Sequence, residues 1–365
     1  MNSKLIFIGY DLTLSALENQ SLVSGEVKNA NYLMQSLNEI GVDILPISIN
    51  LTDKESNVTA IKKSSAKGVF RWYREAKKLN VLLDKQVKPG DIIYLTIPSY
   101  LPFLKVKKNI KVAITAHGTY WPELIADLKY ENSKVKKALH LVNGFFQLRI
   151  DKRSYTKANL IHSVSDYQID EMVKTYSVER SKIVSIRNGT NFSKIDVEKK
   201  FDFIWVGRLA KKKNIKLFID FIEQVGFTNV CMCVGSDYFA IDSKSKELIK
   251  NYEFNDRVKV VKDISDKELN CLMSQSSCLV VSSTGYESIP TVIFEGIASG
   301  CKVLAPDSWG VREVEGSGVY LYEEGCLESL KVEYEKSLCD ISIPELHDEA
   351  RWDSRAKKFK EFFQI

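Results

Sequence analysis

The stretch CLVVSSTGYESIPTVIFEGIASG, residues 278–300, has the local pattern that decides the fold. An apolar run at 278–281 is followed by small polar residues, which predicts a short buried strand. Val292–Ser299 predicts a helix, and Gly300 stands where helices often end. Pro290, near the first turn, removes an N–H group that has no partner inside a helix. The stretch therefore predicts a strand, a loop and a helix, in that order.

Two glutamates, Glu287 and Glu295, stand on either side of the start of this helix. The N–H groups of a helix start face the preceding loop, which suits a phosphate. A phosphate alone needs no carboxylate beside it. The two carboxylates make sense if the ligand carries hydroxyl groups next to its phosphates, as a nucleotide sugar does.

The same alternation of strand-like and helix-like runs extends along the chain. Further strands are predicted at 4–9, 43–49, 91–96, 112–116, 160–163, 182–186, 203–206, 230–234, 258–261 and 302–305. Further helices are predicted at 28–40, 73–83, 166–176, 215–225, 266–274 and 354–363. This order predicts an α/β protein with parallel sheets covered by helices. The polar segment 188–200 interrupts the pattern like a linker, and a length of 365 residues also suggests two domains.

Composition gives a coarse class and excludes others. Hydrophobic residues make up 44% and charged residues 27%, which is ordinary for a globular protein. No apolar run approaches the length of a membrane span, and residues 4–9 read as a first strand and not as a signal peptide. The seven cysteines show no C-x-x-C spacing, so we expect reduced packing residues of a cytosolic protein and no metal site.

The charge is divided unevenly along the chain. Residues 1–195 contain 29 Lys and Arg against 18 Asp and Glu, whereas the remainder is net acidic. One interpretation is a solvated surface; the other is an N-terminal half that faces an anionic membrane or acceptor. Nucleic acid is disfavoured, because no basic motif interleaved with aromatic residues accompanies these charges.

Four other residues point to a ligand. Arg208 and Lys213 follow a predicted strand and precede a helix, where cations bind a diphosphate and stabilise the charge of a leaving nucleoside diphosphate. His117 ends another strand and is followed by Gly118, which favours contact with a ligand, although a lone histidine is more often structural. Gly25 precedes a helix and allows close approach of the backbone. Ser165 is interpreted as a structural N-cap.

With these motifs in place, the chain resembles glycosyltransferase family 4, the group 1 glycosyl transferases, which have the GT-B fold. The matching motifs, in family order, are Ser24-Gly25, His117-Gly118, Ser163-Val164-Ser165, Asn188-Gly189, Val206-Gly207-Arg208-Leu209 with Lys213, Glu287–Glu295, and Gly300-Cys301-Lys302-Val303 with Glu313. The resemblance implies two Rossmann-like doubly wound domains that face a deep cleft. We expect an acceptor-binding domain at 1–195, a nucleotide-sugar-binding domain at 200–345, and a C-terminal helix within 346–365 that packs back on the first domain.

The resemblance also implies roles for individual residues. Arg208 and Lys213 match the basic pair on the donor diphosphate, and Glu287 and His117 match residues at the donor sugar. Glu295 matches the glutamate that binds the ribose hydroxyls. The other implied substrate contacts are Gly25, Gly235, Ile264, Ser288, Ile289, Thr291 and Val292. This chain departs from the family where Ser24 and Ser288 replace frequent glycines and where Thr291 replaces a common asparagine.

The function implied is a retaining glycosyltransferase that needs no metal or other cofactor. It would move a hexose from a UDP- or GDP-sugar to a glycan, lipid-linked or polysaccharide acceptor in bacterial-type surface glycan synthesis. Its expected location is the cytoplasm, at the inner face of the membrane. The alternatives are a non-catalytic GT-B subunit, which should lack one of the charged site residues, and another GT-B enzyme such as a sugar-nucleotide epimerase or a phosphorylase.

Overall fold

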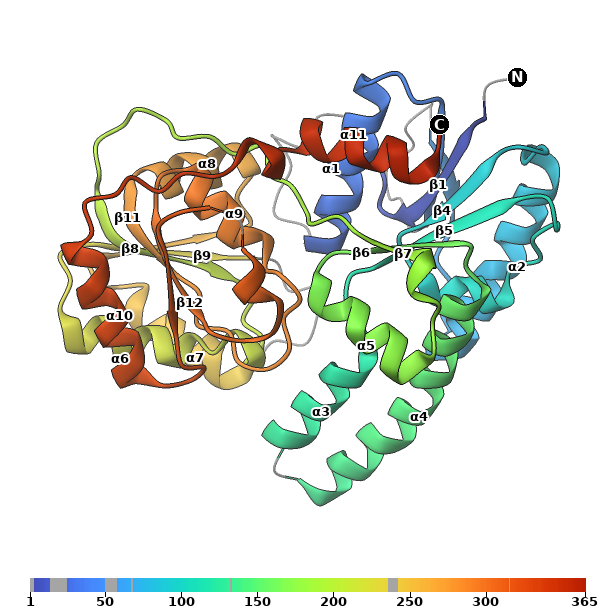
Figure 1. Cartoon of the computed structure of the whole chain (residues 1–365). Helices are drawn as coiled ribbons and strands as arrows, with labels where there is room; N and C mark the ends of the chain where they lie inside the picture. Colours follow the sequence, from blue (N-terminus) through green and yellow to red (C-terminus); the bar gives the residue numbers. More distant parts are fainter. Residues whose placement is uncertain are drawn as a thin grey trace. The chain divides into compact units, whose positions relative to one another are not determined.

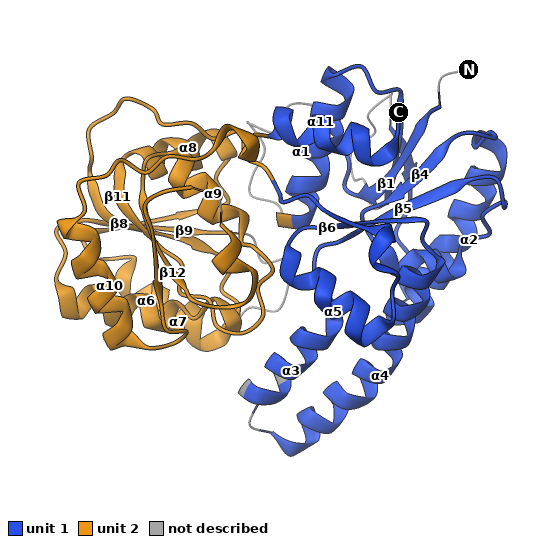
Figure 2. Cartoon of the chain, viewed as in Figure 1, with its two compact units in different colours: residues 1–15, 26–188, 352–365 blue, residues 16–25, 189–351 orange. Residues whose placement is uncertain are grey.

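The computed structural model describes residues 3–13, 25–49, 58–66, 68–131, 133–235, 242–314 and 316–365. They divide into two compact units, each with its own parallel sheet (Figure 2). Unit 1 contains Glu26–Asn188 and Trp352–Ile365 together with the first residues of the chain, and unit 2 contains Gly189–Arg351. The division after Asn188 falls at the start of the segment that was predicted to be a linker.

Unit 1 is built on a parallel sheet with the strand order β3-β2-β1-β4-β5-β6-β7 (Figure 1). The strands are β1 (Leu5–Tyr10), β2 (Ile44–Ile49), β3 (Thr59–Ile61), β4 (Ile92–Leu95), β5 (Lys111–Ala116), β6 (Leu160–Ser163) and β7 (Ile183–Ser185). The central strand β4 is IIYL and is buried along its whole length. A continuous apolar run of this kind is expected where helices cover both faces of a sheet.

The helices of unit 1 include one from the far end of the sequence. They are α1 (Gly25–Glu39), α2 (Gly68–Gln86), α3 (Tyr120–Tyr130), α4 (Lys134–Lys157), α5 (Asp166–Tyr176) and α11 (Trp352–Phe363), with the short 3₁₀ helix η2 (Pro98–Phe103). The C-terminal α11 packs on this sheet: Phe363 lies 5.0 Å from the ring of Tyr94 and Phe359 lies 4.5 Å from the ring of His162. Its first residue, Trp352, stacks on Tyr32 of α1.

Unit 2 has a second parallel sheet, with the strand order β10-β9-β8-β11-β12-β13. The strands are β8 (Phe201–Gly207), β9 (Val230–Val234), β10 (Val258–Lys262), β11 (Ser276–Val280), β12 (Lys302–Pro306) and β13 (Val319–Tyr322). The helices are α6 (Ile215–Val225), α7 (Ser243–Tyr252), α8 (Asp266–Ser274), α9 (Thr291–Ala298) and α10 (Leu327–Cys339), with 3₁₀ turns η4 (Lys211–Lys213) and η5 (Trp309–Glu313). Two apolar core clusters lie between this sheet and its helices.

The apolar pattern predicted most of these elements correctly. The helices expected at 166–176 and 215–225 are α5 and α6, and the strands expected at 160–163 and 230–234 are β6 and β9. The pattern missed the two edge strands β3 and β13 and the helices α3, α4, α7 and α10. No helix in the described parts of the chain is long and apolar enough to cross a membrane.

Candidate functional site

The carboxyl edge of the unit 2 sheet gathers most of the predicted site residues. β8 ends at Gly207, which is followed by Arg208, and β9 is followed by Gly235. The Gly235 N–H group donates to the Gly207 carbonyl oxygen over 3.1 Å. A Cβ atom placed on Gly235 would lie 3.5 Å from Cγ of Arg208. Arg208 and Gly235, which are 27 positions apart in the sequence, therefore share one corner of the sheet edge.

Lys213 and Glu287 form an ion pair at the same edge. The Lys213 Nζ atom lies 2.7 Å from Glu287 Oε1, and the two side chains are 19% and 15% exposed. Backbone contacts fix this geometry, because Ser282 Oγ donates to the Lys213 carbonyl over 2.8 Å and the Thr284 N–H donates to the Lys212 carbonyl over 2.7 Å. The loop after β11 is thus attached to the η4 turn after β8.

The charge on Glu287 is stabilised by its neighbours. Burial alone would raise the pKa of this carboxyl group. The positive charges of Lys213, Lys212 and Arg208, together with the hydrogen bond from Lys213, outweigh burial and hold the pKa below its usual value. Glu287 is therefore an ionised carboxylate at neutral pH, next to a set of cations suited to phosphate groups.

The loop that carries Glu287 packs closely against η5. At Gly310 an added Cβ atom would lie 1.8 Å from the Ser288 carbonyl oxygen and 2.8 Å from the Ser288 carbonyl carbon. Tyr286 and Trp309 also pack edge to face at 5.3 Å. Gly310 was not predicted from the sequence, because the contact joins two segments that are separate in the chain.

Helix α9 begins directly after this loop, with Pro290 as its N-cap residue. The predicted contact residues differ in burial: Ile289 is buried, whereas Ser288, Thr291 and Val292 are half-buried. Glu295, on the second turn, is only 4% exposed. Gly300 takes a φ of +80° after the helix end, as its predicted place required.

Ile264 lies at the neighbouring strand. It follows β10 and is half-buried against the core of unit 2. The residue before it, Asp263, donates its N–H group to the Val234 carbonyl at the end of β9 over 3.1 Å. The structure thus brings Arg208, Lys213, Gly235, Ile264, the 287–292 loop and Glu295 to one edge of the unit 2 sheet, as the sequence predicted.

Two predicted residues remain: His117, which follows β5, and Gly25, which is the first residue of α1. His117 follows β5 in unit 1, and its buried Nε2 atom has no hydrogen-bond partner among the residues that the structure describes. Burial lowers the pKa of His117, although the Glu26 carboxylate acts in the opposite direction. A buried nitrogen without a partner costs free energy unless a ligand or water satisfies it. Gly25 is the first residue of α1, beside Glu26, and its Cβ position is open; Ser24 lies outside the described residues.

The interpretation of Ser165 as a capping residue needs correction. Ser165 stands at the N-cap position of α5 but makes no capping hydrogen bond, and its buried hydroxyl oxygen has no partner among the described residues. The neighbouring Ser163 hydroxyl bonds instead to the Ser165 carbonyl oxygen over 2.7 Å and to Gln168 over 3.1 Å. The side chain that supports this turn is therefore that of Ser163.

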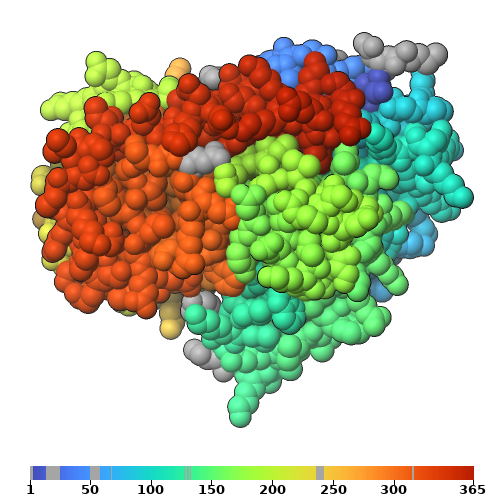
Figure 3. All heavy atoms as spheres, in the orientation of Figure 1, coloured from blue at the N-terminus to red at the C-terminus, as the bar shows by residue number. Residues whose placement is uncertain are grey.

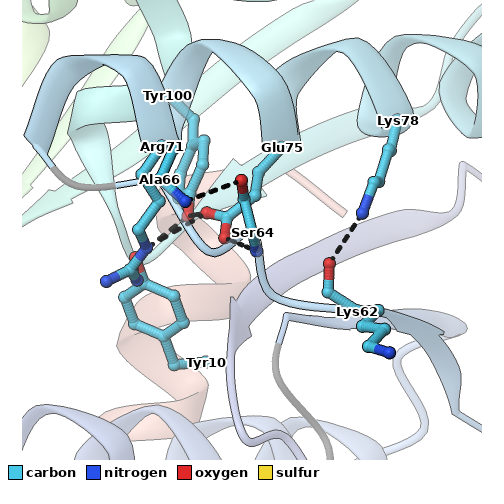
Figure 4. Close-up of polar contacts among 8 residues, drawn as sticks. All are labelled: Tyr10, Lys62, Ser64, Ala66, Arg71, Glu75, Lys78 and Tyr100. Carbon is cyan, nitrogen blue, oxygen red and sulfur yellow. Dashed lines mark hydrogen bonds and ion pairs between the residues drawn. The ribbon is translucent and has the colours of Figure 1, made fainter.

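A second polar cluster, which was not predicted from the sequence, lies in unit 1 near the carboxyl ends of β1, β3 and β4 (Figure 4). The fully buried Glu75 of α2 accepts hydrogen bonds from Arg71 Nε over 3.3 Å, from the Ser64 N–H over 2.7 Å and from the Tyr100 hydroxyl. Arg71 also donates to the hydroxyl of Tyr10, the last residue of β1. The cluster connects the segments that follow β1, β3 and β4.

Within the described ranges, no group of three or more His, Cys, Asp or Glu side chains lies close enough together to hold a metal ion. The seven cysteines are free thiols, and Cys231, Cys233, Cys278 and Cys301 are buried.

Comparison with known families agrees with the architecture. A model described as glycosyl transferases group 1 matches residues 189–358, and a model described as glycosyltransferase family 4 matches residues 55–194. The chain belongs to glycosyltransferase family 4. It is also 29% identical over 173 residues to the O-antigen chain mannosyltransferase RfbU of Salmonella typhimurium. That match covers 46% of this chain and 47% of RfbU, about half the length of each.

Solved structures show the same fold over the whole chain. Sucrose-phosphate synthase from Thermosynechococcus elongatus has a TM-score of 0.72 and 16% identity, and the match covers 100% of this chain and 94% of that one. HepE from Anabaena in complex with UDP has a TM-score of 0.65 and 15% identity, with 99% and 95% covered. The expected GT-B fold, built from two Rossmann-like sheets, is confirmed.

Proposed function

We propose that the chain transfers a hexose from a nucleoside-diphosphate sugar to a glycan, lipid-linked or polysaccharide acceptor, with retention and without a metal ion. The observation that carries this proposal is the Lys213–Glu287 pair beside Arg208, at the carboxyl edge of the unit 2 sheet and at the start of α9. Parallel sheets bind ligands at this edge. The proposal is supported by the name of RfbU, an O-antigen chain mannosyltransferase, and by the UDP bound to HepE.

Each residue has a part in the proposed reaction. Arg208 and Lys213 bind the donor diphosphate and stabilise its growing charge as the bond between the anomeric carbon and the phosphate oxygen breaks. Glu295 accepts hydrogen bonds from the ribose hydroxyls. Glu287 and His117 contact the donor sugar. The acceptor oxygen bonds to the anomeric carbon on the same face, and its proton passes to the leaving phosphate, so no protein nucleophile is required.

The first test is a panel of UDP-, GDP- and ADP-hexoses incubated with the purified chain in EDTA. We expect one nucleotide class to release nucleoside diphosphate at a rate that EDTA leaves unchanged. An NMR spectrum of the new glycoside should show the anomeric configuration of the donor. Loss of all turnover in EDTA would reject metal independence. Failure of every donor both to react and to bind would reject the donor assignment.

The acceptor side of the proposal rests on helix α4, which carries an exposed apolar stripe. Val135, Leu139, Val142 and Phe146 recur at the spacing of one helix face and are 71%, 57%, 57% and 54% exposed. In the space-filling view α3 and α4 project from the rest of unit 1 (Figure 3). Contiguous exposed apolar surface of this kind marks a site of interaction.

Basic residues accompany the stripe, which favours an anionic lipid surface as its occupant. Lys134 and Lys136 are exposed at the start of α4, and Lys152 and Arg153 are exposed in its last part. Apolar residues that enter a headgroup region, flanked by cations, are typical of helices that lie on membranes. We therefore place the enzyme at the cytoplasmic face of a membrane, where a lipid-linked acceptor is available.

Flotation with vesicles tests this placement. The chain should float with vesicles of one-third phosphatidylglycerol, and binding should fall severalfold at 0.5 M salt because screening weakens exposed charge pairs. Val142→Glu with Phe146→Glu should abolish binding, whereas Val332→Glu, an exposed apolar residue of α10, should leave it unchanged. If vesicle binding changes neither with salt nor with these substitutions, the proposal that α4 binds an anionic lipid surface is wrong. Light scattering that shows a dimer lost in the double variant would assign the stripe to self-association.

A further inference from the structure

The turn that follows His117 is held by side chains from α4 and α5. The Gly118 carbonyl accepts from the Tyr155 hydroxyl over 3.5 Å, and the Thr119 hydroxyl donates to Glu171 Oε2. The Trp121 N–H group, in the first turn of α3, donates to the Tyr176 hydroxyl over 3.3 Å. A second buried acid, Asp151, lies close to Tyr120 and accepts from Gln147 Nε2 over 2.9 Å. Gly118, Thr119 and Trp121 therefore each have a side-chain partner.

The two acids near this turn are an unusual choice for a packed interior. Asp151 and Glu171 are only 6% and 8% exposed, and neither forms an ion pair with a described residue. Glu171 Oε1 is buried and accepts no hydrogen bond from any residue in the described ranges. Burial raises the pKa of each group to about 7; the charge of Asp151 also raises that of Glu171, and Glu123 raises that of Asp151. Apolar residues of similar size would cost less free energy here.

A purely structural role does not require this arrangement, since one acceptor at the start of α3 would cap the helix. The feature that needs the full set is the orientation of the residue just before it. The buried Nε2 atom of His117 has no partner within the described parts of the chain, so a small rotation of the turn would change where this nitrogen points. Misplacing a group that contacts substrate by about 1 Å can cost about a hundredfold in rate.

We propose that Thr119 and Glu171 are positioning residues that hold His117 in the orientation in which it contacts the donor sugar. This inference rests on the proposed function, because the sugar contact of His117 is part of it. Glu171 holds the Thr119 side chain and Tyr176 holds the Trp121 N–H group, so the backbone is held on both sides of Tyr120. The residues act through His117 and do not touch the substrate themselves.

A double-mutant cycle between Thr119 and His117 tests the inference through activity. Thr119→Val removes the hydroxyl that Glu171 accepts, and His117→Ala removes the sugar contact; each should lower kcat/KM at least about tenfold. The kcat/KM of the double variant should lie within about twofold of that of His117→Ala, because both changes remove the same contact between His117 and the donor sugar. Thr119→Ser keeps the hydroxyl and should restore activity. Multiplying effects in the double variant would overturn the inference.

Imidazole NMR gives a readout that needs no turnover. The chain has four histidines, so selective labelling gives four sets of ring signals, and His117→Ala assigns one of them. Thr119→Val and Glu171→Gln should shift the His117 signals and leave those of His347 in unit 2 unchanged. Asp170→Asn, an exposed acid of α5, is the control and should shift neither. Unchanged His117 signals in both variants would leave α3 anchoring as the sole role of Thr119 and Glu171, whether or not a donor sugar is found.

Discussion

Glu287→Gln is expected to lower kcat for sugar transfer by about 10²- to 10³-fold and to leave the donor KM within about threefold. The substitution keeps the shape of the side chain and removes a charge that Lys213, Lys212 and Arg208 stabilise in the folded protein. As the bond to the diphosphate breaks, positive charge develops on the sugar ring, and a fixed carboxylate beside it stabilises that charge most in the transition state. Initial rates over a range of donor concentrations separate the two constants.

Glu295→Gln provides the contrast, since the two glutamates have different proposed partners. Its carboxylate, on the buried side of α9, should hold the ribose hydroxyls in substrate and transition state alike. Loss of such uniform binding raises KM, here by about tenfold, with a smaller change in kcat. Glu335→Gln, an exposed acid of α10, is the matched control. If both site variants behave like the control, the assignment of this sheet edge is wrong.

The folded state must be checked in the same variants. Glu287→Gln replaces the carboxylate that lies 2.7 Å from the Lys213 ammonium group with a neutral amide, which should lower the free energy of unfolding by about 1–3 kcal/mol. Urea unfolding measures this loss. A variant that is folded at the assay temperature and still loses kcat separates the chemical role from the structural one.

Local pattern was enough to predict the elements around Glu287 in the candidate site, because these elements are contiguous in the sequence. The segment 278–300 contains its own strand, loop and helix, and these became β11 and α9 around Glu287. The order of strands and helices then brought Arg208, Lys213 and Gly235 to the same edge. The rule that ligands bind at the carboxyl ends of parallel strands then predicted where the candidate site should lie.

The sequence did not predict contacts between distant segments. It also did not predict elements that are very short or whose apolar residues do not face the core. Helix α4 has apolar residues on a face that is exposed, so its pattern does not resemble that of a helix packed on a sheet. Strand β3 has three residues, too few for alternation to be visible. The bond from Thr119 to Glu171 joins positions 52 apart, and neither residue stands in a motif.

Gly310→Ala is expected to lower kcat/KM for the donor by at least about 10²-fold. The new methyl carbon would lie 1.8 Å from the Ser288 carbonyl oxygen, and real contacts of this kind are never so short. The atom that it meets belongs to the backbone, so the conflict cannot be relieved by a side-chain rotation. Either η5 or the 287–290 loop must move, and the loop carries the Glu287 carboxylate that is proposed to contact the donor sugar.

Gly318→Ala separates displacement of this loop from a general loss of stability. Gly318 is also crowded, with Pro344 at 2.9 Å from the added Cβ atom, and its φ of +78° disfavours alanine. It precedes β13 and so lies at the amino edge of the unit 2 sheet, away from the loops that follow the strands. Both variants should unfold at lower urea concentration than the parent. At a temperature where both remain folded, Gly318→Ala should keep the kinetic constants of the parent, and Gly310→Ala should not. Equal kinetics in the two variants would mean that the position of Ser288 does not matter for transfer, and Glu287 would then have to act from a loop that tolerates displacement.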